Sequence, residues 1–313
     1  MPKEKDITEK TLESHPDVFA DIVNGLLFDG REVIRETELE DASPVSQLKL
    51  DGALHEQERD AAKYWKHDEI RIALCGLENQ TKPDRDMVLR ILGYDGAAYK
   101  EQVNLHVGEH RAGKVPSPVY PALTLVLYFG DTPWTAPRTL RECFGQMPDA
   151  LMPYVQDYRI HVFEIAFLTP EQINRFRSDF RLVADFLVQK RTKKEYTPPE
   201  DTIRHVDEVL KLLSAVTGDR SYEEVRNALE ERDKEGTTMC DVVNSFVEKG
   251  RVQGHMQGLT EGRREGRREG ERIVIDILRE MQSGKTDEQI FKIHPKASPD
   301  LVQTLRQTLP YPY

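Results

Sequence analysis

The near-continuous apolar run PALTLVLYFG at residues 121–130 is the feature that most constrains the fold of this chain. It has the length of a strand and lacks polar alternation, which is typical of a strand buried on both faces of a sheet. IRIALCGLENQ (70–80) and YRIHVFEIAFL (158–168) are further apolar segments that predict strands. Because helical patterns alternate with these strands, the sequence predicts an α/β fold.

The predicted elements between residue 17 and about residue 190 follow the order helix, strand pair, helix, strand, strand, helix. Apolar residues at helical spacing predict the first helix at 17–28, and RDAAKYW (59–65) predicts the first strand of the pair. We expect the second helix to begin near Pro83, with Thr81 as a candidate N-cap. Residues 170–190 predict one closing helix.

Composition changes along the chain predict five regions. The basic cluster and proline pair in QKRTKKEYTPPED separate the α/β region from a helical one, and this segment is predicted to be a linker. The predicted regions are a polar N-terminal lead (1–16), an α/β core (17–195), a helical extension (196–240), a glycine-punctuated helical segment (241–282) and short C-terminal helices (283–313).

The overall composition excludes several classes of protein. No apolar run approaches the ~20 residues that span a bilayer, so we expect no membrane insertion. The three cysteines are widely spaced without a CxxC pair, which favours the reducing cytoplasm over a disulfide framework or a structural zinc site. The formal net charge is −11, so nucleic-acid binding would require a local basic face.

The strand at residues 70–80 ends in the polar residues Glu78, Asn79 and Gln80. Side chains alternate along a strand, so Glu78 and Gln80 share one face while Asn79 points to the other. If a turn centred on residues 68–70 joins the strand pair, Asp60 lies directly opposite Glu78. Two facing carboxylates repel unless a cation compensates them, and Mg²⁺ prefers such oxygen ligands. The alternative is a pair of exposed acids at a strand end.

Several stretches of the sequence resemble a known protein family. They are FADIVNGLLF, ERDAAKYW, IALCGLENQT, MVLRILGYDGAAYKEQ, PALTLVLYFGDTPW, FRSDFRLVADFLV and the glycine-rich EKGRVQGHMQGLTEGRREGRREG. Together they resemble the family of recombination-promoting nucleases and putative transposases, part of the PD-(D/E)XK nuclease superfamily. The resemblance implies an α-β-β-β-α-β nuclease core, followed here by an all-helical C-terminal region.

The resemblance also implies roles for individual residues. It places the metal-binding acids at Asp60 and Glu78, with the backbone carbonyl of Asn79 as a candidate third ligand, and it places Gln80 where the superfamily has a lysine. The sequence departs from the superfamily pattern because Gln80 brings no charge and because Arg59 precedes Asp60 in place of proline. The further matches are Asp21 as an accessory acid, with Asn24 as its competitor, and Arg90 and Tyr94 as polar helix positions that contact a phosphate or brace the site.

Glycine recurs every fourth residue from Gly250 to Gly270. Six glycines cost a helix about 5–6 kcal/mol relative to alanine. Close approach of a second helix would recover this cost, so the stripe predicts a homo-oligomer, and a flexible charged linker is the alternative. Local excesses of positive charge make a set of side chains candidate phosphate contacts, with a solvated face as the alternative. They are Lys190, Arg191, Lys193, Lys194, Arg263 and Arg267.

Taken together, the sequence predicts a cytoplasmic, Mg²⁺- or Mn²⁺-dependent DNA endonuclease linked to recombination or transposition. Asp60, Glu78, Gln80 and Asp21 are its predicted catalytic residues. The alternative is a nuclease-fold protein that has lost cleavage and acts as a DNA- or protein-interaction module. An RNA-directed nuclease also remains open at this stage.

Overall fold

The computed structural model describes residues 11–43, 45–50, 53–68, 70–193, 196–230 and 236–308. The chain divides into two compact units, one ending at Val243 and the other beginning at Asn244. The first unit holds every strand among the described residues, and the second is helical. An α/β fold with a helical C-terminal region is therefore confirmed.

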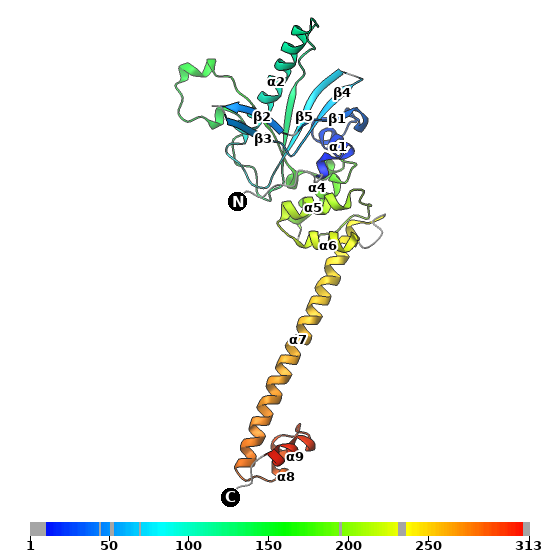
Figure 1. Ribbon diagram of the computed structural model, residues 1–313, viewed down its shortest axis with the longest axis vertical. Coiled ribbons are helices and arrows are strands. Elements are labelled where there is room, and N and C mark those ends of the chain that lie inside the picture. The colour runs from blue at the N-terminus through cyan, green and yellow to red at the C-terminus, as the bar shows by residue number, and fades with distance from the viewer. Residues whose placement is uncertain are drawn as a thin grey trace. The chain divides into compact units, whose positions relative to one another are not determined.

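A five-stranded sheet forms the centre of the first unit (Figure 1). The first three strands in the sheet order are antiparallel, and the last three are parallel. A separate antiparallel hairpin, β2 (Val45–Leu50) and β3 (Ala53–Glu58), precedes the second strand of the sheet. The sheet order is β1 (Leu39–Asp41), β4 (Ala61–His67), β5 (Ile70–Gln80), β6 (Ala122–Tyr128) and β7 (His161–Glu164).

The predicted strand pair is confirmed as the β4–β5 hairpin. Its register runs from Ala61 opposite Leu77 to Trp65 opposite Ala73, so paired residue numbers sum to 138 as expected, until a bulge follows Trp65. This register, continued by one residue, brings Asp60 next to Glu78. The run at 121–130 forms β6 between β5 and β7, with its central residues fully buried. The last strand is shorter than expected, because residues 165–167 turn into a 3₁₀ helix.

Helix α1 (Pro16–Leu27) matches its prediction, and helix α2 (Met87–Arg111) begins later than expected. Asp86 occupies the N-cap position, and its N–H donates to Asp84 Oδ1 at 2.9 Å in the turn before the helix. The expected N-cap at Thr81 is therefore wrong. Helix α2 packs Met87, Val88, Ile91 and Tyr94 against β6, because these residues recur at helical spacing.

The single helix expected at 170–190 is in fact two helices, α3 (Pro170–Ile173) and α4 (Phe180–Thr192). The chain breaks between them because the N–H groups of Arg177 and Ser178 donate to the Asp21 side chain instead of to a preceding turn.

The predicted helical extension is present as α5 (Val206–Thr217) and α6 (Ser221–Glu230), joined at Gly218 with φ +71°. Both helices belong to the first unit. The segment predicted to be a linker is held against α4, since Thr197 hydrogen-bonds in both directions with the Gln189 side chain. The short 3₁₀ helices are η1 (Leu12–Ser14), η2 (Glu36–Glu38), η3 (Arg141–Cys143), η4 (Asp149–Tyr154) and η5 (Ile165–Phe167).

The start of the described chain differs from the expected polar lead. Leu12 and Glu13 in η1 are buried, and η1 packs against α1, α5 and β4. Residues 1–10 of the predicted lead lie outside the described residues.

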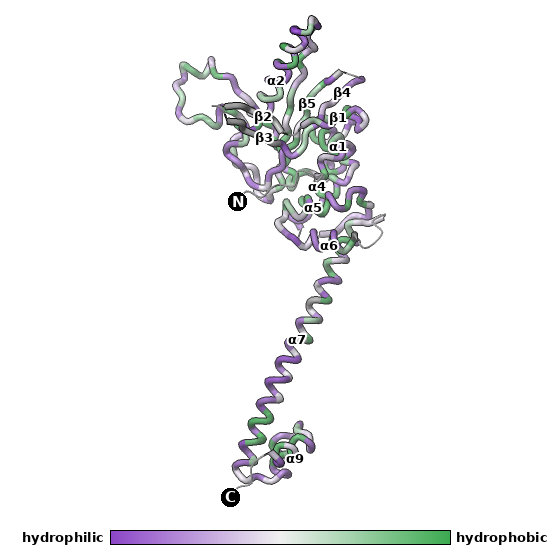
Figure 2. Tube along the Cα trace, viewed as in Figure 1, coloured by the Kyte–Doolittle hydropathy of each residue, from purple (hydrophilic) through white to green (hydrophobic). Residues whose placement is uncertain are grey.

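The second unit contains most of helix α7 (Met239–Gln282), together with α8 (Asp287–Ile293) and α9 (Pro299–Thr308). Ile277 and Met281 of α7 pack with Ile290 and Val302 in a small apolar cluster. The middle of α7 is hydrophilic (Figure 2). Apart from neighbouring residues and the nearby backbone of α7 itself, no described atom comes within 4 Å of the position that a Cβ would take at the six glycines from Gly250 to Gly270. None of the helices in the described ranges is both long and apolar enough to cross a bilayer.

Candidate active site

Asp60 and Glu78 lie at the end of the β4–β5 hairpin that also carries Asn79 and Gln80. Asp60 Oδ2 accepts the Asn79 backbone N–H at 2.7 Å, which fixes the Asp60 carboxylate beside the last residues of β5. Glu78 is only 3% exposed. Glu78 Oε1 accepts hydrogen bonds from Gln80 Nε2 at 3.1 Å and from Arg90 Nη2. Glu78 Oε2 is buried and has no hydrogen-bond partner among the residues that the structure describes.

The electrostatic environment of Glu78 disfavours a bare carboxylate. Burial is the main cause that raises the pKa of Glu78 to about 7, and the nearby charge of Asp60 adds to it. Arg90 opposes both effects without cancelling them. A buried acid with a neighbouring acid, a raised pKa and one unpartnered oxygen is a fitting ligand for a cation.

Helix α2 supplies two polar side chains to the same place. Arg90 and Tyr94 are four residues apart and therefore share one helical face, and Arg90 Nη2 donates to the Tyr94 hydroxyl at 3.2 Å. Arg90 also pairs with Asp84 at 3.1 Å in addition to its ion pair with Glu78. Arg90 thus lies against Glu78, and Tyr94 lies against Arg90.

A buried network anchors the residue that precedes Asp60. Arg59 is 2% exposed and forms an ion pair with Asp95 of α2 at 3.1 Å, while its Nε donates to Thr124 of β6 at 3.1 Å. A Cβ at Gly76 would lie 2.6 Å from Arg59 Cδ, so the glycine inside β5 makes room for the arginine. The Arg59 network ties the start of β4 to α2 and β6.

Glu13 is a third acid that the sequence did not reveal. It is fully buried, and its Oε1 accepts a hydrogen bond from Asn79 Nδ2 at 3.1 Å. Its Oε2 has no partner within the described part of the chain. Burial raises the pKa of Glu13, and the charge of Asp60 raises it further. The only sequence signal near Glu13 is Leu12, a single apolar residue in a polar segment.

Asp21 and Asn24, the two candidates for the accessory acid position, contact other parts of the fold. Asp21 Oδ2 accepts the N–H groups of Arg177 and Ser178 and the Ser178 hydroxyl at 2.7–2.8 Å. The Asn24 side chain bonds the backbone of Val33 and Ile34. Asp21 and Asn24 thus both hold loops in place through hydrogen bonds. The acid that the structure places beside Asp60 is Glu13.

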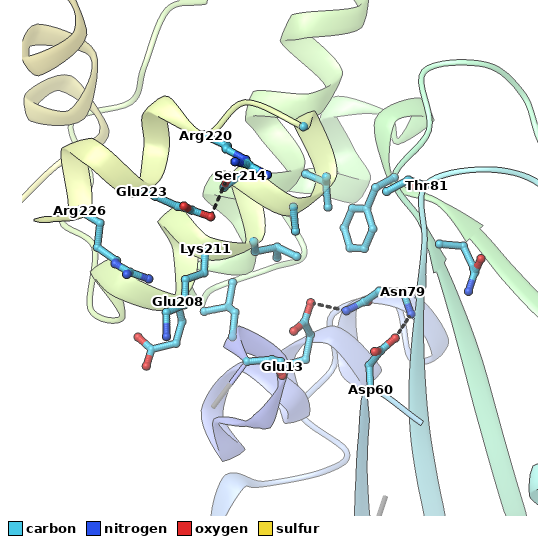
Figure 3. Close-up of a pocket in the computed structure, with 18 residues that line it drawn as sticks. Glu13, Asp60, Asn79, Thr81, Glu208, Lys211, Ser214, Arg220, Glu223 and Arg226 are labelled. Atoms are coloured by element: carbon cyan, nitrogen blue, oxygen red, sulfur yellow. Dashed lines mark hydrogen bonds between the residues drawn. The ribbon is translucent and has the colours of Figure 1, made fainter. Parts of the chain in front are cut away.

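A pocket of about 1030 Å³ opens beside the strand ends (Figure 3). Asp60, Glu13, Asn79 and Gln80 line it from the sheet side, whereas Glu78 is not among the residues that line it. Helices α5 and α6 and the turn between them form the other side. Charged side chains from these helices and the turn line the pocket, namely Lys211, Arg220 and Arg226 with Glu208 and Glu223.

The basic residues predicted from sequence do not line this pocket. Arg191 donates to the Ala166 carbonyl at 2.7 Å, and Lys193 donates to the Gln189 side chain. Lys190 lies over the Phe186 ring. Lys194 lies outside the described residues, and Arg263 and Arg267 are exposed on α7 in the second unit. The cations of the pocket have no sequence pattern that marks them, because Lys211 and Arg226 are isolated basic residues on α5 and α6 and Arg220 lies in the turn between these helices.

The sequence matches one known protein family over about half of its length. No curated protein and no solved structure matches it. Residues 72–222 match the family model described as "Putative transposase, YhgA-like". The matched range contains Glu78, Gln80, Arg90, Lys211 and Arg220, while Glu13 and Asp60 precede it and Arg226 follows it. Over these residues the chain is similar to the YhgA-like putative transposase family, which confirms the resemblance to a family of putative transposases expected from its sequence.

Proposed function

We propose that this protein is a metal-dependent DNA endonuclease of the PD-(D/E)XK type that acts in transposition or recombination. The observation that carries the proposal is the adjacency of Asp60 and Glu78 at one hairpin end, with Glu78 buried and its Oε2 unpartnered. The element order α1–β1–β4–β5–α2–β6 supports the superfamily placement, since it repeats the expected α-β-β-β-α-β order around the inserted β2–β3 hairpin. The family description supports the link to transposition.

The residues present fit a divalent cation of the Mg²⁺ or Mn²⁺ type. Asp60 and Glu78 would hold it, with the Asn79 backbone carbonyl as a candidate third ligand. A cation there would give Glu78 Oε2 the partner that it lacks and would favour the ionised form of the carboxylate. When bound, such a metal lowers the pKa of a coordinated water and offsets the charge that develops on a phosphodiester.

The side chains around the acids have complementary tasks in this proposal. The Gln80 amide, which now donates to Glu78, orients a water by hydrogen bonding. Arg90 neutralises Glu78 in the metal-free chain and then turns its guanidinium to a phosphate oxygen. Tyr94 holds Arg90 in place through its hydroxyl.

The far side of the pocket suits the backbone of a nucleic acid. Lys211, Arg220 and Arg226 offer positive charge across from Asp60 (Figure 3). Arg226 Nε is buried and has no hydrogen-bond partner among the described residues. Contacts of this kind position a strand without reading its sequence.

One observation favours a second function, that of a nuclease-fold interaction module without cleavage. Arg90 pairs directly with Glu78, and Gln80 replaces the superfamily's charged lysine, so the metal-free chain already compensates part of its acidic charge. In that case the pocket would bind a nucleic acid or a protein, and Asp60 and Glu78 would bind no metal.

The two functions are separated by incubating the protein with supercoiled plasmid in Mg²⁺, in Mn²⁺ and in EDTA. The nuclease proposal predicts nicked or linear DNA with either metal and intact DNA in EDTA. Asp60→Ala and Glu78→Ala abolish this cleavage, while the control Glu164→Gln, at the end of β7 and outside the pocket, retains it. Intact plasmid with both metals overturns the nuclease proposal, and a parallel single-stranded RNA substrate shows whether RNA is cut instead.

A further inference from the structure

A cluster of two histidines and two carboxylates lies where the start of α1 approaches the start of α5. His205 Nε2 lies 3.2 Å from Asp17 Oδ1 and 3.1 Å from Asp17 Oδ2. The rings of His15 and His205 stack with their centroids 3.8 Å apart, and His15 Nε2 lies 3.5 Å from Glu208 Oε1. One possible ligand atom from each of His15, Asp17 and His205 lies within 4.8 Å of the others.

The cluster contains a ligand atom that makes no hydrogen bond. His15 Nε2 is buried and makes no hydrogen bond within the described ranges. An imidazole nitrogen of this kind is a common ligand of metal ions.

We propose that His15, Asp17 and His205, with Glu208 as a fourth ligand, bind one Zn²⁺ ion. Two imidazoles and carboxylate oxygens form a donor set that suits zinc and is unlike the all-oxygen set that Mg²⁺ prefers. Zinc bonds of about 2.0–2.1 Å place neighbouring tetrahedral ligands about 3.3 Å apart. Two contacts, His205–Asp17 at 3.1 Å and His15–Glu208 at 3.5 Å, already have about this spacing, and the ligand atoms of His15, Asp17 and His205 all lie within 4.8 Å of one another. The four side chains are 14–21% exposed, which leaves a route for the ion.

Two features of the surroundings oppose a cation. The cluster lies at the N-terminal ends of α1 and α5, whose peptide dipoles are positive there. Arg204 also pairs with Asp17 at 2.9 Å. The two carboxylates offset the dipoles, and Arg204 is 71% exposed, so its guanidinium can turn to solvent when zinc occupies Asp17.

Zinc at this position would join segments that are distant in sequence. Asp17 and His205 are 188 residues apart, and the backbone N–H of His205 is already held by Asp179 at 2.6 Å. Glu208 also lines the large pocket, so the metal would fix the α5 wall against the start of the chain. This inference stands independently of the proposed nuclease function.

The test is zinc binding by the full chain, measured by equilibrium dialysis and elemental analysis after EDTA treatment. We expect one tightly bound zinc per chain and a higher melting temperature with zinc than without it. His15→Gln and His205→Gln should each weaken binding by more than about 100-fold, because loss of an outer-shell partner alone costs about 10–100-fold. Two controls should bind zinc like the wild type: His255→Gln, an exposed histidine of α7, and the Asp60→Ala/Glu78→Ala double variant.

Absence of bound zinc overturns the inference, as does equal binding by the histidine variants. Loss of zinc from the Asp60→Ala/Glu78→Ala protein alone also overturns it, since the ion would then belong to the other site. If a histidine variant does not fold, the proposal can still be tested with the wild-type protein alone, by recording its absorption spectrum with Co²⁺. Intense visible absorption from four-coordinate Co²⁺ supports the proposal, and the weak absorption of six-coordinate Co²⁺ contradicts it.

Discussion

The ionisation of Glu78 gives the sharpest physical test of the candidate active site. Its pKa in the folded chain is about 7 against an ordinary value of 4.5, mainly because the carboxyl is buried. At about 1.36 kcal/mol per pH unit, keeping this group ionised costs the folded state about 3 kcal/mol. Because the folded pKa is raised, the cost is absent below the unfolded pKa, grows between pH 4.5 and pH 7, and is fully present above pH 7.

Replacing Glu78 by glutamine removes this titration while keeping the shape of the side chain. In EDTA, the stability of Glu78→Gln relative to the wild type should therefore rise by about 3 kcal/mol between pH 4.5 and pH 8. Urea unfolding followed by tryptophan fluorescence measures the difference, because both tryptophans, Trp65 and Trp134, lie in the first unit. The change with pH is the measured quantity, so a constant offset from altered contacts to Arg90 does not affect it.

A matched control distinguishes Glu78 from any other carboxylate at a strand end. Both oxygens of Glu164 have partners, in Arg138 and the Trp134 N–H, so Glu164→Gln measures the effect of replacing a carboxyl whose oxygens are both partnered. A difference between Glu78→Gln and wild type that stays constant from pH 4.5 to pH 8 would refute the reasoning. Mg²⁺ at about 100 times its dissociation constant should stabilise the wild type by about 2.7 kcal/mol and stabilise Glu78→Gln much less.

Three further changes test other parts of the site and the tail. Gln80→Lys should preserve or raise the plasmid cleavage rate, because a lysine ammonium can also donate a hydrogen bond to Glu78 and adds a positive charge. A clear loss of cleavage rate would show that the Gln80 amide acts as a hydrogen-bond acceptor. Glu13→Gln should raise the metal-free melting temperature at pH 8 and leave it unchanged at pH 4.5 in scanning calorimetry, because burial raises the pKa of Glu13; an equal change at both values would contradict this. Leucine at Gly258, Gly262 and Gly266 should convert an oligomer to monomers in analytical ultracentrifugation, because the added side chains push a partner helix away; a wild type that is already monomeric at micromolar concentration would end the helix-contact hypothesis.

The parts of the fold that the sequence predicted depend on short-range regularities. The β4–β5 register followed from strand alternation and one turn, and it correctly placed Asp60 beside Glu78. The β6 strand followed from its uninterrupted apolar run. In both cases the residues that form the strands are the same residues whose sequence pattern predicts them.

The parts that sequence analysis missed depend on contacts between distant segments. Glu13 is buried only because η1 packs against β4 and α5, and Asn79, its hydrogen-bond partner, is 66 residues away. The break between α3 and α4 depends on Asp21, more than 150 residues earlier. A polar residue within a polar segment is not part of any sequence pattern that predicts contacts with distant segments. Its role is therefore visible only in the three-dimensional structure.

The Arg59 network fixes the residue before Asp60, the position at which the resemblance to the PD-(D/E)XK superfamily implies a proline. A proline before the first acid would restrict the backbone through its own ring. Here Arg59 is fixed instead by Asp95, which also accepts hydrogen bonds from Thr124 and from the Tyr158 hydroxyl. Four segments therefore converge on the residue before Asp60, and the Asn79 N–H fixes the Asp60 carboxylate itself. Since a buried ion pair that loses one partner is strongly destabilised, this network holds Asp60 in position only as long as both Arg59 and Asp95 remain.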